Sequence, residues 1–381
     1  MSKPSIRFLY LGDPKTDRRL KNFISLFSGL GYKVELIIAS PRATNDESRI
    51  TIEGAATTEI HLDHSRGAKM FLEYNRLLQN ELANREPCDI LFACELYSLK
   101  AAAQAKQNGK AKKLIFDARE LYTELPTVAS NPLKKLFWKR WEKRGLEQAD
   151  LIIVTAPDDA AAIKQVHGFL PESIVIRNLP KREEFHTNDY LRKYYHILFE
   201  KKIFVYVGGM QTDRGLRNMI DTMTSLKDIA VFIMIGEGIL KERLQEQSIQ
   251  LGLQNVVFFH PAIDSEKIIE ILSSADIGIS LIEQHSKSYQ FALPSKVFEY
   301  LLAGLPVISS PLKQVRDIFA GNEGVIFAEP DNPAALIGAC KGAIALSNNA
   351  NLRKQIHDDA YSNFTFEKDE QALKNYLSNN I

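Results

Sequence analysis

The feature that most constrains the fold of this 381-residue chain is a series of short apolar runs separated by helix-length stretches. Strands that are buried on both faces carry apolar residues at consecutive positions, and their alternation with helices is typical of parallel sheets. Twelve such strands exceed what one twisted open sheet usually holds, so two sheets are expected. The predicted strands are Ile6–Leu11, Val34–Ala39, Ile90–Ala93, Leu114–Phe116, Leu151–Thr155, Ile174–Ile176, Ile203–Val207, Val231–Ile235, Val256–Phe259, Ile277–Ile282, Val307–Ser309 and Val325–Phe327.

A polar stretch without such a run, Pro180–Lys202, separates the two sets of strands. We therefore predict an α/β fold of two facing Rossmann-like domains with parallel sheets. The net charge of +1 gives no reason to expect a nucleic-acid partner. The three cysteines are too scattered for a disulfide framework or a zinc cluster, and no apolar run has the length of a signal peptide or membrane span. A cytoplasmic protein is expected.

Glycines follow several of the predicted strands, where doubly wound sheets bind their ligands. Gly12 follows the first strand, Gly208 and Gly209 follow the seventh, and Gly236 and Gly238 follow the eighth. After the seventh strand a helix begins near Arg214, which could pair with a phosphate at that helix start. The spacing fits neither a Walker loop nor a dinucleotide fingerprint, and a plain glycine turn with a surface arginine remains an alternative.

A second candidate segment, Leu293–Glu299, begins a predicted helix. Pro294 and Ser295 fit the helix start, with Ser295 as the N-cap residue. Lys296 and Glu299 are three residues apart and therefore share one helical face. The alternative to a binding role is a solvated lysine–glutamate pair.

These segments together resemble a known enzyme family. The order and spacing of VGG-x4-RGL, IGEG, NVVFFHPAI, SSADIGISL and LPSKVFEYLLAGLPVI are similar to the carboxyl-terminal half of family-four retaining glycosyltransferases of GT-B fold. The resemblance spans Phe204 to about Phe327, and FDARELYTE in the first half agrees more loosely. It implies an acceptor domain (1–183), a nucleotide-sugar donor domain (184–352) and a C-terminal helix (353–381) that crosses back to the first domain.

The resemblance also implies roles for particular residues. Arg214 matches the residue that neutralises the leaving diphosphate, Lys296 is placed to help, and Glu299 matches the carboxylate that holds the ribose hydroxyls. Glycines and the Phe259–Ala262 loop would line the donor mostly through backbone. The implied catalytic residues are Arg214, Lys296, Arg119 and Asp117, and the implied donor-binding residues are Gly12, Gly208, Gly209, Gly236, Gly238, Pro261, Leu293, Pro294, Ser295, Val297 and Glu299.

The chain departs from the family at three places. The family's usual arginine after the glycine of the seventh strand is missing, and Gly209 and Met210 stand there, which leaves Arg214 with a larger share of the diphosphate charge. Phe291 stands where the family has a glutamate that contacts donor sugar hydroxyls, so Gln290 or Tyr289 would have to replace that contact. Arg119 stands where a histidine is common, within a polar cluster of Asp117, Arg119 and Glu120 that directly follows a strand. The alternative for this cluster is a salt-bridged loop.

The implied activity is hexosyltransferase-like and metal-independent, and it needs no cofactor beyond its nucleoside-diphosphate-sugar donor, with UDP favoured over GDP. The expected acceptor is a saccharide or a lipid-linked acceptor in surface glycan synthesis. Two alternatives remain open: a non-catalytic protein that binds a nucleotide sugar or a partner, and a sugar-nucleotide epimerase or hydrolase.

A basic aromatic stretch lies between Asn131 and Asp150. Six basic residues oppose Glu142 between Lys134 and Arg144, and Leu133, Leu136, Phe137 and Trp141 share one helical face with Trp138 at its edge. Such a helix can lie on an anionic membrane surface. We therefore expect peripheral membrane contact through Leu133–Trp141 at the inner face of the membrane; the alternative is that the apolar face packs on the first sheet.

Overall fold

The computed structural model describes residues 3–41, 51–283 and 292–380. The chain divides into two compact units: Met1–Asn178 with Asp369–Ile381, and Leu179–Lys368. The break therefore comes five residues before the expected boundary at 183/184. Residues 353–368, expected with the first domain, belong to the second unit because Leu352, Ile356 and Ala360 are buried one helical turn apart in its core.

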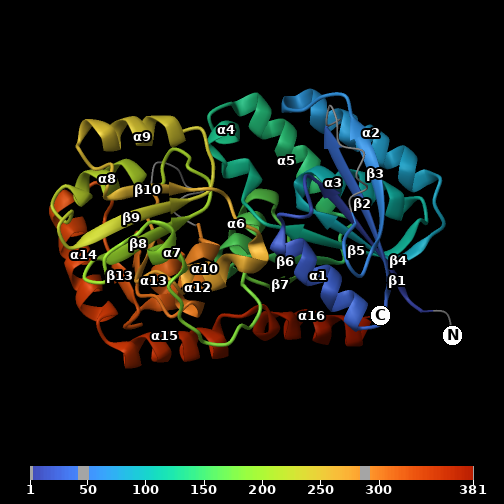
Figure 1. Cartoon of the computed structure of the whole chain (residues 1–381). Coiled ribbons are helices and arrows are strands. Elements are labelled where there is room, and N and C mark those ends of the chain that lie inside the picture. The colour runs from blue at the N-terminus through green and yellow to red at the C-terminus, as the bar shows by residue number, and fades with distance from the viewer. Residues whose placement is uncertain (1–2, 42–50, 284–291, 381) are drawn as a thin grey trace. The chain divides into compact units, whose positions relative to one another are not determined.

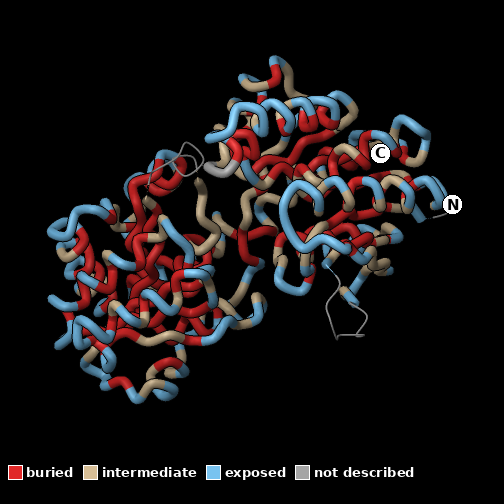
Figure 2. Tube along the Cα trace, turned by 90° about the horizontal axis from the view of Figure 1, so that it is seen from above, coloured by how far each residue is buried: buried red, intermediate tan, exposed pale blue. Residues whose placement is uncertain are grey.

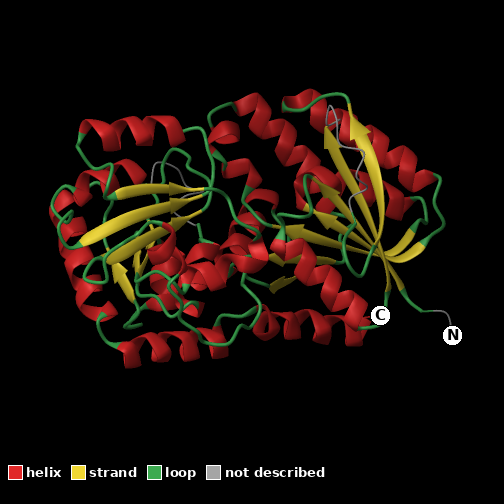
Figure 3. Ribbon diagram, viewed as in Figure 1, coloured by secondary structure: helices red, strands yellow, loops and turns green. Residues whose placement is uncertain are grey.

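The first unit is built on a seven-stranded parallel sheet in the order β3-β2-β1-β4-β5-β6-β7 (Figure 1). Helices lie on both faces of this sheet (Figure 3). The strands are β1 (Ser5–Leu11), β2 (Lys33–Pro41), β3 (Ala56–Leu62), β4 (Cys88–Cys94), β5 (Ala111–Ala118), β6 (Leu151–Val154) and β7 (Glu172–Val175). The helices are α1 (Arg18–Gly29), α2 (Gly67–Ala83), α3 (Glu95–Gln107), η1 (Tyr122–Glu124), α4 (Pro126–Ala129), α5 (Pro132–Leu146), α6 (Pro157–His167) and, from Asp369 onward, α16 (Phe366–Asn380).

Strand β3 is the one strand of the described residues that the apolar runs did not predict. Its sequence, ATTEIHL, alternates polar and apolar residues, and most of its side chains are only half-buried. This pattern fits its position at the edge of the sheet, where β3 pairs with β2 alone. Edge strands need not be apolar on both faces, so a search for continuous apolar runs misses them.

The second unit is built on a six-stranded parallel sheet in the order β10-β9-β8-β11-β12-β13. Its strands are β8 (Lys202–Val207), β9 (Ala230–Ile235), β10 (Val257–His260), β11 (Ile277–Ser280), β12 (Val307–Ser309) and β13 (Val325–Phe327). Its helices are α7 (Tyr190–Tyr194), α8 (Leu216–Met223), α9 (Lys241–Gln250), η2 (Ser265–Lys267), α10 (Ile268–Leu272), α12 (Ser295–Leu302), α13 (Lys313–Phe319), α14 (Pro333–Ser347) and α15 (Ala350–Asn363).

Alternate residues of β8 enter different cores. Ile203, Val205 and Val207 pack with α10, α12, α13 and α15 on one face of the sheet. Phe204 and Tyr206 pack with α8, α9 and α14 on the other face. Figure 2 shows buried stretches of the chain, in red, inside both units. Burial on both faces is what the continuous apolar runs predicted, and the predicted fold class of two parallel α/β domains is confirmed.

Candidate functional site

Two glycine turns at the carboxyl ends of β8 and β9 lie against each other in the second unit. Gly208 has φ 132° and Gly236 has φ 134°, backbone conformations that other residues rarely adopt. A Cβ atom on Gly236 would lie 2.3 Å from the Gly208 carbonyl oxygen. Only glycine therefore allows these two turns to approach so closely, and their contact with a ligand stays a prediction.

The following residues of the two turns are also joined through backbone. Met210 N–H donates to the Glu237 carbonyl at 2.8 Å, and Leu240 N–H donates to the Met210 carbonyl at 3.0 Å. A Cβ atom on Gly238 would lie 2.3 Å from the Met210 carbonyl oxygen. Gly209 accepts a hydrogen bond from the Tyr206 hydroxyl at 2.8 Å. The glycine turns thus form one layer of backbone at the carboxyl ends of β8 and β9.

Arg214 lies between two residues with positive φ, Asp213 at 62° and Gly215 at 61°. Gly215 caps the N-terminus of α8, and a Cβ atom there would lie 2.7 Å from Leu281 Cβ. The Asp213 carbonyl accepts the Glu283 N–H at 3.1 Å. These contacts fix the backbone on both sides of Arg214, whose side chain is half-buried.

Lys296 is in the first turn of α12 and points toward the same glycine turns. Its Nζ lies 4.6 Å from the centre of the Tyr206 ring and 3.5 Å from where a Cβ on Gly208 would be. Burial and the neighbouring Arg214 charge lower the pKa of Lys296 to about 8, while Glu299 opposes them. Lys296 therefore has both Arg214 and Glu299 as electrostatic neighbours, although Arg214 is far away in the sequence.

The start of α12 differs from the expected capping. Pro294, with φ −67° and ψ 123°, is the N-cap residue, and Ser295 is the first helical residue and caps nothing with its side chain. Val297 N–H donates to the Pro294 carbonyl at 3.2 Å, and the Val297 side chain is fully buried. Since the first N–H groups of a helix lack helical partners, the amides of Ser295 and Lys296 are candidates for contact with a ligand.

Two further predicted residues of this segment differ in burial. Glu299 is buried, with 5 % of its surface exposed. It therefore differs from the glutamate of an ordinary solvated lysine–glutamate pair. Leu293 is partly buried against the core of the second unit. Pro261 is exposed directly after β10, and its carbonyl accepts from His260 Nδ1 at 2.9 Å. Gly236 N–H in turn donates to the His260 carbonyl at 3.1 Å, which joins the two predicted base-lining loops.

Tyr300 anchors this arrangement and was missed from the sequence. Its hydroxyl accepts from Val207 N–H at 2.9 Å and donates to the Ile279 carbonyl at 3.1 Å, so it bridges β8 and β11. A Cβ atom on Gly278 would lie 2.3 Å from the Tyr300 ring. A glycine inside an apolar strand often marks such a close approach, and Gly278 was the available signal.

In the first unit, Asp117 and Arg119 belong to a buried ionic cluster. Asp117 is fully buried, accepts from Arg19 Nη2 at 2.6 Å and from Arg119 Nε at 2.8 Å. Burial alone would raise the pKa of Asp117, but Arg19 and Arg119 outweigh it and hold the pKa below its ordinary value. Asp117 thus positions the two arginines, and a direct catalytic contact by Asp117 stays a prediction.

Arg119 contacts several acidic groups at the carboxyl end of the sheet. It pairs with Asp17, and its Nη1 lies 3.7 Å from Glu95 Oε1. Its Nη2 atom is buried and has no hydrogen-bond partner among the described residues. Gly12, which the sequence placed in the same region, has φ 138° and donates its N–H to Ala39 at 3.0 Å. A donor group of Arg119 therefore remains for a ligand.

Glu95 is a further candidate that sequence reasoning missed. It follows β4 directly and has φ 65°, an uncommon backbone conformation for a residue with a side chain. Burial raises the pKa of Glu95 to about 7; Arg119 opposes this shift, and Asp17 adds to it. Strained residues with perturbed pKa values often occur at functional sites. The rule that polar residues after strands carry chemistry would have found Glu95 if applied to this strand.

Phe291, Gln290 and Tyr289 lie outside the described residues. In the part of the chain that the structure describes, no group of three or more His, Cys, Asp or Glu side chains is arranged to hold a metal ion. Across the described segments, every helix falls short of the length and apolar character needed to span a bilayer.

Helix α5 carries the basic aromatic stretch, for which the alternatives were contact with a membrane surface and packing on the first sheet. The burial of its side chains has features of both. Trp138 and Trp141 are buried, as the packing alternative requires. Leu133, Leu136 and Phe137 are 81 %, 52 % and 45 % exposed, as a surface-binding helix requires. The apolar face is therefore divided: its tryptophans pack inward and its first turns present apolar side chains to solvent.

The second unit is similar to a family of known proteins. Residues 191–363 match the family described as glycosyl transferases group 1. The putative colanic acid biosynthesis glycosyl transferase WcaI of Escherichia coli is 28 % identical over 196 residues, which cover 50 % of this chain and 46 % of that protein. An uncharacterised glycosyltransferase of Methanocaldococcus jannaschii is 26 % identical over 290 residues, which cover 71 % of this chain and 69 % of that protein. The chain thus spans about half of the first relative's length.

The fold also matches solved structures across nearly the whole chain. Sucrose-phosphate synthase of Thermosynechococcus elongatus has a TM-score of 0.81 at 17 % identity and covers 99 % of both chains. Anabaena HepE in complex with UDP and glucose has a TM-score of 0.74 at 15 % identity, covering 97 % of this chain and 99 % of that one. Residues 191–363 of the second unit are thus similar to the glycosyl transferases group 1 family, and the chain has the GT-B fold.

Proposed function

We propose that this protein is a retaining glycosyltransferase that moves a sugar from a nucleoside diphosphate to a saccharide or lipid-linked acceptor. One observation carries the proposal: the Lys296 ammonium group lies beside the glycine turn after β8, and the charge of Arg214 acts on it there. Burial first, and the Arg214 charge second, lower the pKa of Lys296, so a bound anion would stabilise the charged form of this lysine. A diphosphate supplies that anion.

The second unit is the proposed donor-binding unit. The diphosphate would bind Arg214, Lys296 and the amides at the start of α12, where the helix dipole favours negative charge. Glu299, on the same helix, would accept both ribose hydroxyls. UDP is the proposed nucleoside diphosphate of the donor, and the UDP complex of the structurally similar HepE supports this choice. The donor base lies against the glycine and Pro261 loops.

The proposed reaction retains the configuration of the anomeric carbon. The bond between that carbon and the diphosphate oxygen breaks, and the acceptor oxygen forms a new bond on the same face. The departing phosphate oxygen takes the proton of the acceptor hydroxyl. Arg214 and Lys296 stabilise the charge that develops on the diphosphate, a contribution that grows only in the transition state. The chemistry needs no cofactor beyond the donor.

The first unit is the proposed acceptor-binding unit. Arg119 keeps a buried donor nitrogen, and Glu95 supplies a carboxyl group whose raised pKa suits hydrogen bonding to hydroxyl groups. The exposed Leu133 and Leu136 beside basic residues of α5 support contact with an anionic membrane surface. We propose a cytoplasmic enzyme that acts at the inner face of the membrane on an acceptor held there.

A donor screen tests the proposal. The full chain is incubated with a panel of UDP- and GDP-sugars, and release of nucleoside diphosphate is measured with and without saccharide acceptors. Transfer or slow hydrolysis of one donor is expected, with the product's anomeric configuration retained by proton NMR. Nucleotide binding without turnover of any donor would instead favour a non-catalytic binding protein, and an altered but untransferred sugar would favour an epimerase.

A further inference from the structure

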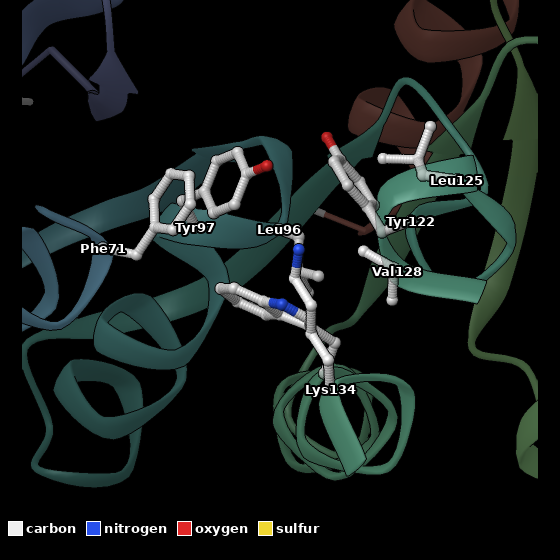
Figure 4. A pocket seen from close by; sticks show the side chains of 8 residues that line it. Phe71, Leu96, Tyr97, Tyr122, Leu125, Val128 and Lys134 are labelled. Atoms are coloured by element: carbon white, nitrogen blue, oxygen red, sulfur yellow. The ribbon is translucent and has the colours of Figure 1, made fainter. Parts of the chain in front are cut away.

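A pocket of about 160 Å³ lies in the first unit, between α3 and the segment that runs from η1 to α5 (Figure 4). Aromatic rings form much of its wall. Phe71 and Tyr97 stack with ring centres 4.0 Å apart, and Trp138 meets both rings edge-on at 5.6 Å. The pocket is outside the cluster of Asp117 and Arg119, so the proposed reaction does not account for it.

The remaining wall is largely aliphatic. Leu96, Leu125 and Val128 complete the lining, so a group inside would touch carbon on most sides. An apolar cavity of about 150 Å³ holds a molecule of the size of benzene. The pocket therefore suits one compact, branched hydrocarbon unit of about five carbons, such as an isoprene unit. A sugar ring would need several polar partners that these three side chains do not provide.

Two polar side chains give the pocket a direction. Lys134, from α5, is exposed and lines the pocket, where its ammonium group can pair with a phosphate. Tyr122 is 4 % exposed, and its hydroxyl has no hydrogen-bond partner among the described residues. Figure 4 shows Tyr97 and Tyr122 on opposite sides of the pocket, with Lys134 reaching in from the helix below. A ligand with an apolar body and an anionic end fits this pattern.

The surroundings favour the same kind of ligand. Leu133, Leu136 and Phe137 continue the apolar surface outward along α5, and the exposed Arg140 carries further positive charge. We infer that this pocket binds the isoprene unit next to the phosphate in the isoprenoid-phosphate anchor of a lipid-linked saccharide acceptor, with Lys134 on the phosphate. The inference rests on the proposed function, because it names the class of acceptor that the transferase uses.

Binding of soluble farnesyl phosphate tests the inference directly. Trp138 lines the pocket, and Trp141 is the sequence's other tryptophan, so intrinsic fluorescence of the full chain reports occupancy. A saturable fluorescence change is expected with farnesyl phosphate, a weaker one with unbranched decyl phosphate, and none with inorganic phosphate. No saturable change with farnesyl phosphate would overturn the inference, and equal binding of decyl phosphate would overturn its isoprenoid part.

A pair of neighbouring substitutions locates the site. Val128→Phe fills the pocket and should weaken farnesyl phosphate binding about a hundredfold, since the isoprene unit loses its burial. Ala129→Phe places the same ring one residue further along, on an exposed position, and should leave binding within about twofold. Unchanged affinity in Val128→Phe would overturn the inference.

A charge reversal keeps the test sound if Val128→Phe does not fold. Lys134→Glu changes an exposed side chain and should weaken farnesyl phosphate about tenfold or more while leaving farnesol binding unchanged. Equal affinity of this variant for farnesyl phosphate would count against the pocket. UDP titration of the wild-type chain separates the two proposals: UDP binding without farnesyl phosphate binding contradicts only this inference, and farnesyl phosphate binding without UDP binding contradicts only the proposed donor site.

Discussion

Raising the pH should weaken UDP binding through the titration of Lys296. Burial and Arg214 lower the pKa of this residue to about 8 in the ligand-free protein, against the opposing charge of Glu299. A bound diphosphate adds negative charge and must raise that pKa. Below pH 8 the ammonium group is already present and UDP affinity is flat; above pH 8, UDP binding has to take up a proton, so affinity falls as pH rises.

The size of the effect follows from the same pKa. Each pH unit above about 8 should raise the UDP dissociation constant about tenfold until the pKa of the complex is reached, which gives about thirtyfold between about pH 7 and pH 9.5. The terminal phosphate of the nucleotide is ionised throughout, since its pKa is about 6. Tyr206, the ring under Lys296, has a pKa raised to about 12 by burial and does not titrate in this window.

Isothermal titration calorimetry of UDP at several pH values measures this profile. Titrations in buffers of different ionisation enthalpy give the number of protons that are taken up with UDP above pH 8. Lys296→Arg is the matched control, because a guanidinium group stays charged over the whole range and should give a flat profile. A wild-type dissociation constant that does not change between pH 7 and pH 9.5, or a pH dependence that persists in Lys296→Arg, would refute the reasoning.

Three further substitutions test other parts of the account. Gly236→Ala should lower the free energy of unfolding by about 3 kcal/mol, because the φ of 134° and the 2.3 Å approach to the Gly208 carbonyl oxygen exclude a side chain. Thermal unfolding of both proteins without UDP measures this, and an unchanged melting temperature would contradict it. Asp117→Ala leaves two buried arginines without their shared carboxylate and should cost about 3–5 kcal/mol in urea unfolding, whereas a cost below about 1 kcal/mol would show the cluster to be solvated. Replacing both Leu133 and Leu136 by Ser should weaken binding to anionic vesicles about a hundredfold in flotation assays and leave stability unchanged, while equal flotation would exclude α5 as the membrane contact.

Much of the fold was predictable because buried parallel strands are apolar at consecutive positions. The strand that escaped, β3, lies at the sheet edge and alternates polar with apolar residues. The domain limits were less predictable. Residues 353–368 carry an ordinary amphipathic pattern, and a pattern of this kind shows that a helix packs but not which unit it packs against.

The candidate site was predictable where the local sequence carries the signal. The positive φ values and the close backbone contact after β8 and β9 require glycine. A glycine that follows a predicted strand is therefore a signal that can be read from the sequence. The roles of Glu95 and Tyr300 depend on partners far away in the chain. Nothing next to Tyr300 indicates that its hydroxyl joins Val207 and Ile279, and nothing next to Glu95 indicates its burial near Arg119.

The central claim is that Arg214, Lys296 and Glu299 of the second unit form the donor site. The most direct test is calorimetric titration of UDP into Arg214→Ala and Glu299→Ala, with Arg217→Ala as control, because Arg217 is an exposed arginine of the same helix region. The account predicts that the first two variants stay folded and lose UDP affinity by at least about tenfold, since each removes a charged hydrogen-bonding partner, while Arg217→Ala binds like the wild type. Wild-type affinity in both Arg214→Ala and Glu299→Ala would contradict the assignment of the site.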